Sequence, residues 1–182
     1  MRVVGICGSL REGSFNRALL TAVAAELPPF VEFAEWSGLE TLPAYDADAD
    51  EQFAPPSVAA LRRALADADA VVIATPEYNA SIPGALKNAL DWASRPFPDN
   101  CLRGKPVAVV GASTGIFGGV WAQADLRRIL KTIGANVIET ALPVAAAHHA
   151  FTASGALRDR RLATAVRTIA DELVGQGIGR AA

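Results

Sequence analysis

Short apolar runs rich in β-branched residues alternate along the chain with longer stretches in which apolar residues recur every three or four positions. Runs of four to seven residues bounded by polar or glycine positions are too short for helices and predict buried strands. We expect five strands, at residues 2–7, 31–36, 70–74, 106–112 and 136–140. The fifth strand can extend as far as residue 144. The second run alternates apolar and polar positions, which predicts a strand near the sheet edge.

Helical spacing follows each predicted strand. The first helical pattern begins with Leu19, Leu20 and Val23. A second helix is expected to begin with Ser57 as its N-cap. Three further helices are expected. The first follows Pro83-Gly84 and runs through residue 92, the second is closed by Gly134, and the last ends near Gly175. Residues 37–56 show no clear period, and a connection of that length is commonly functional.

This alternation of strand and helix predicts an α/β fold, a parallel sheet with right-handed crossovers that cover both faces. At 182 residues and 51% hydrophobic positions, we expect a single domain over residues 1–182 with a sizeable core.

Charge and cysteine usage narrow the classes of partner. The formal charge is −2, and no run of one sign suggests nucleic acid, so we expect a small molecule or a second copy of the chain as partner. Cys7 and Cys101 lie far apart and match neither a disulfide framework nor a zinc site, which favours a reducing compartment. No apolar stretch reaches membrane-spanning length, so we expect a cytoplasmic protein without a membrane partner.

Three loops rich in Gly, Ser, Asn and Pro follow predicted strands at the same edge of the sheet. They span residues 8–16, 75–81 and 112–119. Ligands of parallel sheets bind beyond the carboxyl ends of the strands. The sequence therefore predicts one binding site built from all three loops.

The first loop carries donors suited to a phosphate. It ends at a predicted helix N-terminus, and Ser9, Arg11, Ser14 and Asn16 add hydroxyl, guanidinium and amide donors. The lysine of a nucleotide-triphosphate P-loop is missing, and the glycines do not match the dinucleotide fingerprint. A serine-capped helix after a tight turn is the alternative interpretation.

The second and third loops suit a planar ligand. Pro76 stiffens the chain, Tyr78 can pack beside a heterocycle, and peptide N–H groups near Glu77 and Asn79 can donate to it. A rim aromatic is the alternative for Tyr78, and a general acid is the alternative for Glu77, although no partner carboxylate is evident. The third loop contains Gly115, Gly118 and Gly119, which would let its backbone approach a flat ligand closely. The alternative is that these glycines serve only to form a turn.

The two histidines, His148 and His149, are adjacent and make a poor metal site, so we expect no metal. A hydrolase with Ser9 as nucleophile is disfavoured because the serine lacks the G-x-S-x-G context.

Taken together, these motifs closely resemble the NAD(P)H-dependent FMN reductase family of flavodoxin-like proteins, which includes quinone, chromate and azo-dye reductases. The sequence G-S-L-R-E-G-S-F-N resembles the family's FMN phosphate loop, P-E-Y-N the segment that holds the flavin ring, and A-S-T-G with the later G-G pair the loop at the other flavin edge. The resemblance implies that the FMN site comprises Ser9, Arg11, Ser14, Phe15, Asn16, Pro76, Glu77, Tyr78, Asn79, Ala112, Ser113, Gly115 and Gly119. Thr114 stands where many members have proline.

The resemblance further implies a flavodoxin-like five-stranded sheet of order 2-1-3-4-5. It implies FMN as cofactor, NADPH or NADH as electron donor, and ping-pong transfer to a quinone, dye, metal oxyanion or free flavin. A homodimer or homotetramer with residues 83–92 at a subunit contact is also implied. Because the flavin carries the redox chemistry, we name no catalytic acid or base. Two alternatives are an electron carrier without nicotinamide activity and a subunit that keeps the fold but binds no flavin.

Overall fold

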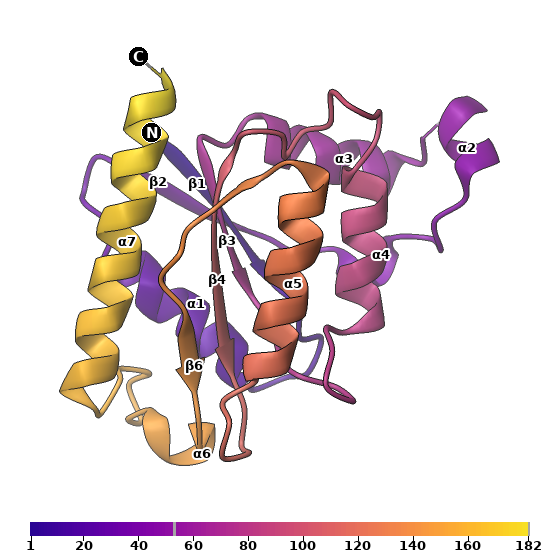
Figure 1. Ribbon diagram of the computed structural model, residues 1–182. Helices are drawn as coiled ribbons and strands as arrows, with labels where there is room; N and C mark the ends of the chain where they lie inside the picture. Colours follow the sequence, from indigo (N-terminus) through magenta and orange to yellow (C-terminus); the bar gives the residue numbers. More distant parts are fainter. Residues whose placement is uncertain (53, 182) are drawn as a thin grey trace.

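A parallel sheet forms the centre of the molecule (Figure 1). The computed structural model describes residues 1–52 and 54–181. Within these residues the strand order is β2-β1-β3-β4-β5, and a sixth strand, β6, also pairs with β4. The strands are β1 Arg2–Cys7, β2 Glu32–Trp36, β3 Ala70–Ala74, β4 Pro106–Ala112, β5 Asn136–Val137 and β6 Leu142–Val144. The predicted flavodoxin-like order is confirmed.

Helices cover both faces of the sheet (Figure 1). The side chains of α3, α4 and α5 pack in one core with one face of the strands, and those of α1 and α7 pack in a second core with the other face. The helices are α1 Phe15–Ala25, α2 Ala47–Gln52, α3 Pro56–Ala66, α4 Gly84–Ala93, α5 Val120–Ile133, α6 Ala147–Ala150 and α7 Arg160–Ala181. No described helix is both long and apolar enough to cross a membrane.

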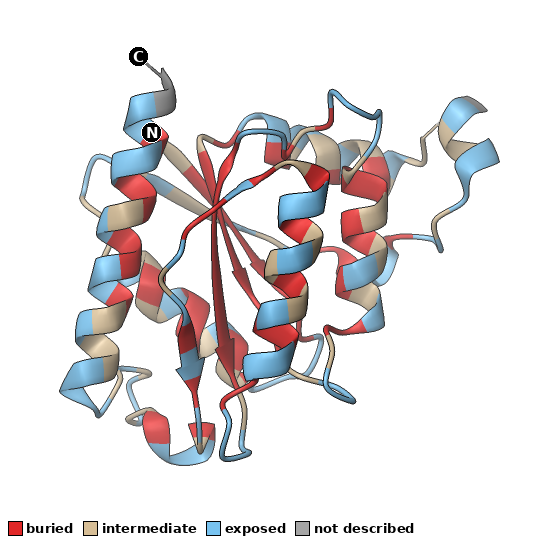
Figure 2. Ribbon diagram, viewed as in Figure 1, coloured by how far each residue is buried: buried red, intermediate tan, exposed pale blue. Residues whose placement is uncertain are grey.

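Burial along the strands follows their order in the sheet. Every residue of β3 and β4 is buried, whereas β2 at the edge has none that is fully buried (Figure 2). Continuous apolar runs therefore mark the central strands, and the alternating run at residues 31–36 marks the predicted edge strand.

The predicted fifth strand is divided into β5 and β6. Both pair with β4, and the chain leaves the ladder between them after Ile138, whose N–H still donates to the Val107 carbonyl oxygen. Arg127 of α5 takes the place of the missing partner, since its guanidinium donates to the carbonyl oxygens of Ile138 at 2.5 Å and Thr140 at 2.6 Å. A side chain from a helix thus satisfies carbonyl groups that a continuous strand would have paired.

Two helix boundaries differ from expectation. Ser57 is not an N-cap, because α3 begins at Pro56, whose fixed φ suits the first helical position. The last helix does not end near Gly175 but continues to Ala181. A Cβ atom at Gly177 would overlap Met1, so glycine there allows the chain terminus to pack against the helix.

The long connection at residues 37–56 contains a 3-10 turn, Leu39–Thr41, and α2, which stands away from the sheet (Figure 1). Arg62 of α3 holds α2 through two hydrogen bonds of 2.7 and 2.8 Å to the Asp50 carboxylate and also donates to the Trp92 carbonyl oxygen. The segment is therefore fastened to α3 and α4.

Candidate cofactor-binding site

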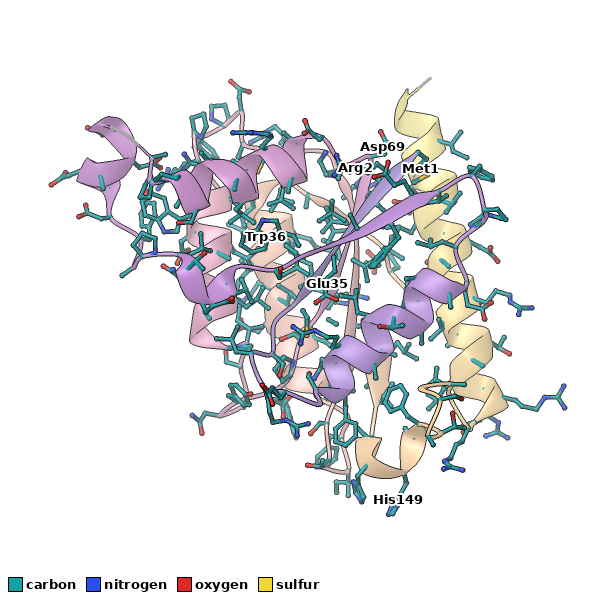
Figure 3. All side chains as sticks on the ribbon, turned by 180° about the vertical axis from the view of Figure 1, so that it is seen from behind. Met1, Arg2, Glu35, Trp36, Asp69 and His149 are labelled. Carbon is teal, nitrogen blue, oxygen red and sulfur yellow. The ribbon has the colours of Figure 1, made fainter. Side chains whose placement is uncertain are left out.

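The three predicted loops line one cavity at the carboxyl ends of the strands. The opposite end of the sheet, where the strands begin, is marked by Met1, Arg2 and Asp69. These residues lie far from His149, which is near the site (Figure 3). The cavity is lined by Ser9, Arg11, Ser14, Phe15, Asn16, Pro76, Glu77, Tyr78, Ala112, Ser113 and Thr114. Of the predicted site residues, Asn79, Gly115 and Gly119 lie outside this lining, and Thr114 joins it.

The first loop presents several donors around the start of α1. The Ser14 hydroxyl caps the helix by accepting from the N–H groups of Asn16 and Arg17 at 3.2 and 3.4 Å. The N–H groups of Glu12 and Gly13 donate to no acceptor in the described parts of the chain. Because such donors surround a helix N-terminus, this end of the cavity suits an anion.

Arg11 lies beside these donors. Its Nη2 donates to the Gly13 carbonyl oxygen at 2.9 Å, and its guanidinium lies 5.4 Å from the centre of the Phe15 ring. Phe15 in turn stacks on Phe151, with ring centres 6.2 Å apart and planes nearly parallel. The exposed guanidinium is thereby held near the anion end of the cavity by an aromatic wall.

Asn16 joins the first loop to the third. Its Nδ2 donates to the Ala112 carbonyl oxygen and its Oδ1 accepts from the Ala112 N–H, both at 2.9 Å. The Asn16 amide is expected from the sequence to donate to a phosphate. In the structure both polar atoms of this buried amide are used by Ala112, so its side chain fixes the spacing of two loops.

Glu77 of the second loop caps α5. The N-cap position of α5 is Gly119, which offers no side chain, and Glu77 Oε2 accepts from the N–H groups of Trp121 at 2.9 Å and Ala122 at 3.0 Å. A second link joins Ser81 to Asp125 at 2.6 Å. The second loop is thus fixed to the first two turns of α5 by two carboxylates.

Two residues outside the predicted site, Asp125 and Gln123, hold the second and third loops. The hydrogen bond from Ser81, followed by that from Arg128, lowers the pKa of Asp125. Gln123 is buried, and its Nε2 donates to the carbonyl oxygens of Gly118 and Gly119. A polar residue on the apolar stripe of a predicted helix was the available signal, since Gln123 precedes Leu126 by three positions.

The second loop reverses direction in a tight turn. Tyr78 and Ser81 exchange two backbone hydrogen bonds of 3.0 and 3.1 Å, and the two residues between them have positive φ angles, 51° at Asn79 and 60° at Ala80. Two positive φ values characterise the type I′ hairpin turn, in which Asn-Gly is favoured. Alanine is therefore the less suitable residue at position 80.

Replacing Ala80 with glycine is expected to raise the free energy of unfolding by about 0.5–1 kcal/mol, because glycine adopts positive φ without a Cβ clash. Urea unfolding monitored by circular dichroism measures the change. Ala124→Gly on the exposed side of α5 is the control, with an expected loss of about 1 kcal/mol. Equal losses in both variants would contradict the strained-turn interpretation.

Aromatic side chains form an exposed rim beside the cavity. Tyr78, Phe117 and Trp121 are each about half exposed, and the Phe117 and Trp121 rings meet edge to face at 4.9 Å. Such surfaces are suited to contact with a planar ligand or another protein surface.

Other candidate chemistry finds no support. The described residues contain no group of three or more potential metal ligands that includes His148 or His149. The Ser9 hydroxyl accepts from the Arg11 N–H and meets no histidine in the described part of the chain. Burial raises the pKa of the Cys7 thiol, so this thiol is not activated as a nucleophile.

The residues present fit a phosphate-bearing planar cofactor. The first loop brings side-chain donors to the cavity, and the second loop brings Pro76 and Tyr78 to it. This donor set matches FMN, which has one phosphate group and a flat ring system.

The sequence profile described as NADPH-dependent FMN reductase matches residues 1–149. The chain belongs to this family. The predicted family is thus confirmed, together with the oxidoreductase class and with FMN and NAD(P)H as its cofactors.

Relatives with curated names agree. The chain is 43% identical over 162 residues to the NAD(P)H-dependent FMN reductase PA1204 of Pseudomonas aeruginosa, covering 87% of this chain and 85% of that protein. It is 44% identical over 139 residues to a quinone reductase of Escherichia coli K12, covering 76% of this chain and 73% of that protein. Among solved structures, FerB of Paracoccus denitrificans, a flavoenzyme NAD(P)H:(acceptor) oxidoreductase, superposes with a TM-score of 0.85 at 34% identity, covering 98% of this chain and 97% of that chain.

Proposed function

We propose that this FMN reductase family member oxidises NADPH or NADH through bound FMN and passes the electrons to a quinone. The proposal extends to azo dyes, metal oxyanions and free flavin, which can also accept electrons from reduced flavin. The observation that carries the proposal is that all three loops line one cavity beyond the strand ends, with phosphate donors in the first loop and the half-exposed Tyr78 ring in the second.

Bound FMN supplies hydride and electron transfer. The residues of the chain supply binding and orientation. The first loop would hold the phosphate through Arg11, the Ser9 and Ser14 hydroxyls and the backbone N–H groups before α1, since these residues line the cavity. Pro76 and the peptide groups from Glu77 to Asn79 would border the ring, and the loop with Ser113, Gly115 and Gly119 would lie along its other edge. Asn16 and Phe15 keep the loops in place.

The decisive experiment is steady-state NAD(P)H oxidation by the purified protein reconstituted with FMN. We expect substrate consumption with a benzoquinone and no need for a partner protein. Loss of the flavin absorbance on gel filtration, together with no oxidation of NADPH or NADH with quinone, dye or free flavin, would overturn the proposal. An electron carrier would instead bind FMN but consume no nicotinamide without a partner enzyme.

Arg11→Ala is expected to weaken FMN binding by about 1.5–3 kcal/mol, because a charge-assisted contact to phosphate is lost. Fluorescence quenching of FMN titrated with protein measures the dissociation constant. Arg160→Ala removes an exposed guanidinium elsewhere and serves as the control. Equal affinities in the two variants would contradict the placement of the phosphate in the first loop.

The proposed assembly is a homodimer or homotetramer in the cytoplasm, with residues 83–92 at a subunit contact. The apolar side of α4 lies in the protein's own core, so the exposed strip that remains for a partner carries the Lys87–Asp91 ion pair. The exposed apolar rim beside the cavity adds surface that a second copy can cover. Light scattering at micromolar concentration tests the proposal, and a monomeric mass would contradict it.

A further inference from the structure

Two helices begin at or beside the cavity, and the chain caps them differently. The neutral hydroxyl of Ser14 caps α1. The N-terminus of α5 receives a carboxylate from another loop, because Glu77 accepts from the N–H groups of Trp121 and Ala122. The cap of α5 therefore places a negative charge in the cavity wall, whereas the cap of α1 is neutral.

The charge of Glu77 is only partly compensated. No lysine or arginine within the described residues forms an ion pair with this carboxylate, in contrast to Asp125, which Arg128 contacts at 2.5 Å. Its compensation comes from two N–H groups of the first turn of α5, whose partial charges form the positive end of the helix dipole, equivalent to roughly half an elementary charge. Net negative charge thus remains at a position that lines the cavity.

We propose that Glu77 is a positioning residue that fastens the second loop to α5 and, through its charge, lowers the reduction potential of FMN in the cavity. The inference rests on the proposed function, since it requires FMN to bind there. Reduction increases the electron density of the flavin ring, and a nearby carboxylate disfavours that change. The effect is electrostatic and needs no contact between the Glu77 side chain and the ring.

Glu77→Gln tests the charge with little change of shape, because the amide oxygen of Gln can still accept a hydrogen bond from α5. The control, Glu32→Gln, removes one exposed carboxylate at the amino end of β2. The cavity lies at the other end of the strands, beyond their carboxyl ends. Spectroelectrochemical titration of the FMN-loaded proteins gives the midpoint potential. We expect Glu77→Gln to favour reduced over oxidised FMN about tenfold, a shift of about +30 mV, and Glu32→Gln to change the potential by much less.

A second variant restores the charge at a neighbouring position. Val120 is the first residue of α5 and is exposed, so Val120→Glu places a carboxylate in the first helical turn. In the Glu77→Gln background it should return the potential towards the wild-type value. In the wild-type background it should lower the potential, which keeps the test available if Glu77→Gln does not fold.

The outcomes separate the two proposals. Wild-type protein that binds no FMN would overturn the proposed function. Wild-type protein that binds FMN, with equal potentials in Glu77→Gln and Glu32→Gln or no response to Val120→Glu, would overturn the role of Glu77 alone. A purely structural role for Glu77 would lower thermal stability without moving the potential.

Discussion

Gly118→Ala is expected to lower the free energy of unfolding by about 2–5 kcal/mol, the larger part of it from overlap with backbone atoms. A Cβ atom at Gly118 would lie 2.7 Å from the Pro143 carbonyl carbon and 2.9 Å from the Ala145 nitrogen. Both are main-chain atoms, one within β6 and one directly after it, so neither can rotate away. The φ angle of +63° adds the cost of a left-handed conformation for a residue with a side chain.

The control for this prediction is Gly104→Ala. Gly104 has nearly the same φ, +66°, but an added Cβ would meet no atom within 4 Å. We expect a loss of about 1–2 kcal/mol from conformation alone. Urea unfolding of the FMN-free proteins measures both values, and their difference isolates the overlap. A difference near zero would show that the third loop can move away from β6, and the close approach would then not be a constraint.

The second large effect is expected for Asn16→Ala, with a loss of about 2–4 kcal/mol. The substitution leaves the buried N–H and carbonyl groups of Ala112 without their partner, and each such group costs about 1–3 kcal/mol. Because the same amide joins the first and third loops, FMN affinity should also fall. Urea unfolding and fluorescence titration provide the two measurements.

Asn136→Ala is the matched control for Asn16. Its Nδ2 also forms a hydrogen bond of 2.9 Å, to Gln176, but this contact is exposed to water. A change within about 0.5 kcal/mol is therefore expected. If Asn16→Ala costs no more than this control, water or a rearranged loop satisfies Ala112, and Asn16 does not brace the site.

The loop chemistry was largely predictable from local sequence. Glycine, serine and arginine in the first loop indicate an anion site because helix N-termini and their flanking donors act over a few residues. The same local reasoning gave Glu77 a possible role toward the ligand. The structure uses its carboxylate for α5, 44 residues along the chain, a pairing that no local pattern contains.

The split of the last strand was not predictable for a related reason. Residues 136–144 have the composition of one strand, and the break depends on Arg127 reaching the carbonyl oxygens of Ile138 and Thr140. The start of α3 at Pro56 was also not predictable, because both Pro56 and Ser57 are favourable near a helix N-terminus.

By itself, the sequence determined the alternating α/β architecture, the order of its strands through the family motifs, and the three loops of the site. Periodicity and loop composition are short-range properties, so they survive without coordinates. Only the tertiary structure decided how the loops are joined to one another, through the Asn16–Ala112 pair, the Glu77 cap and the close approach at Gly118. These contacts connect residues distant in the chain, and their geometry exists only once the sheet has brought the strand ends together.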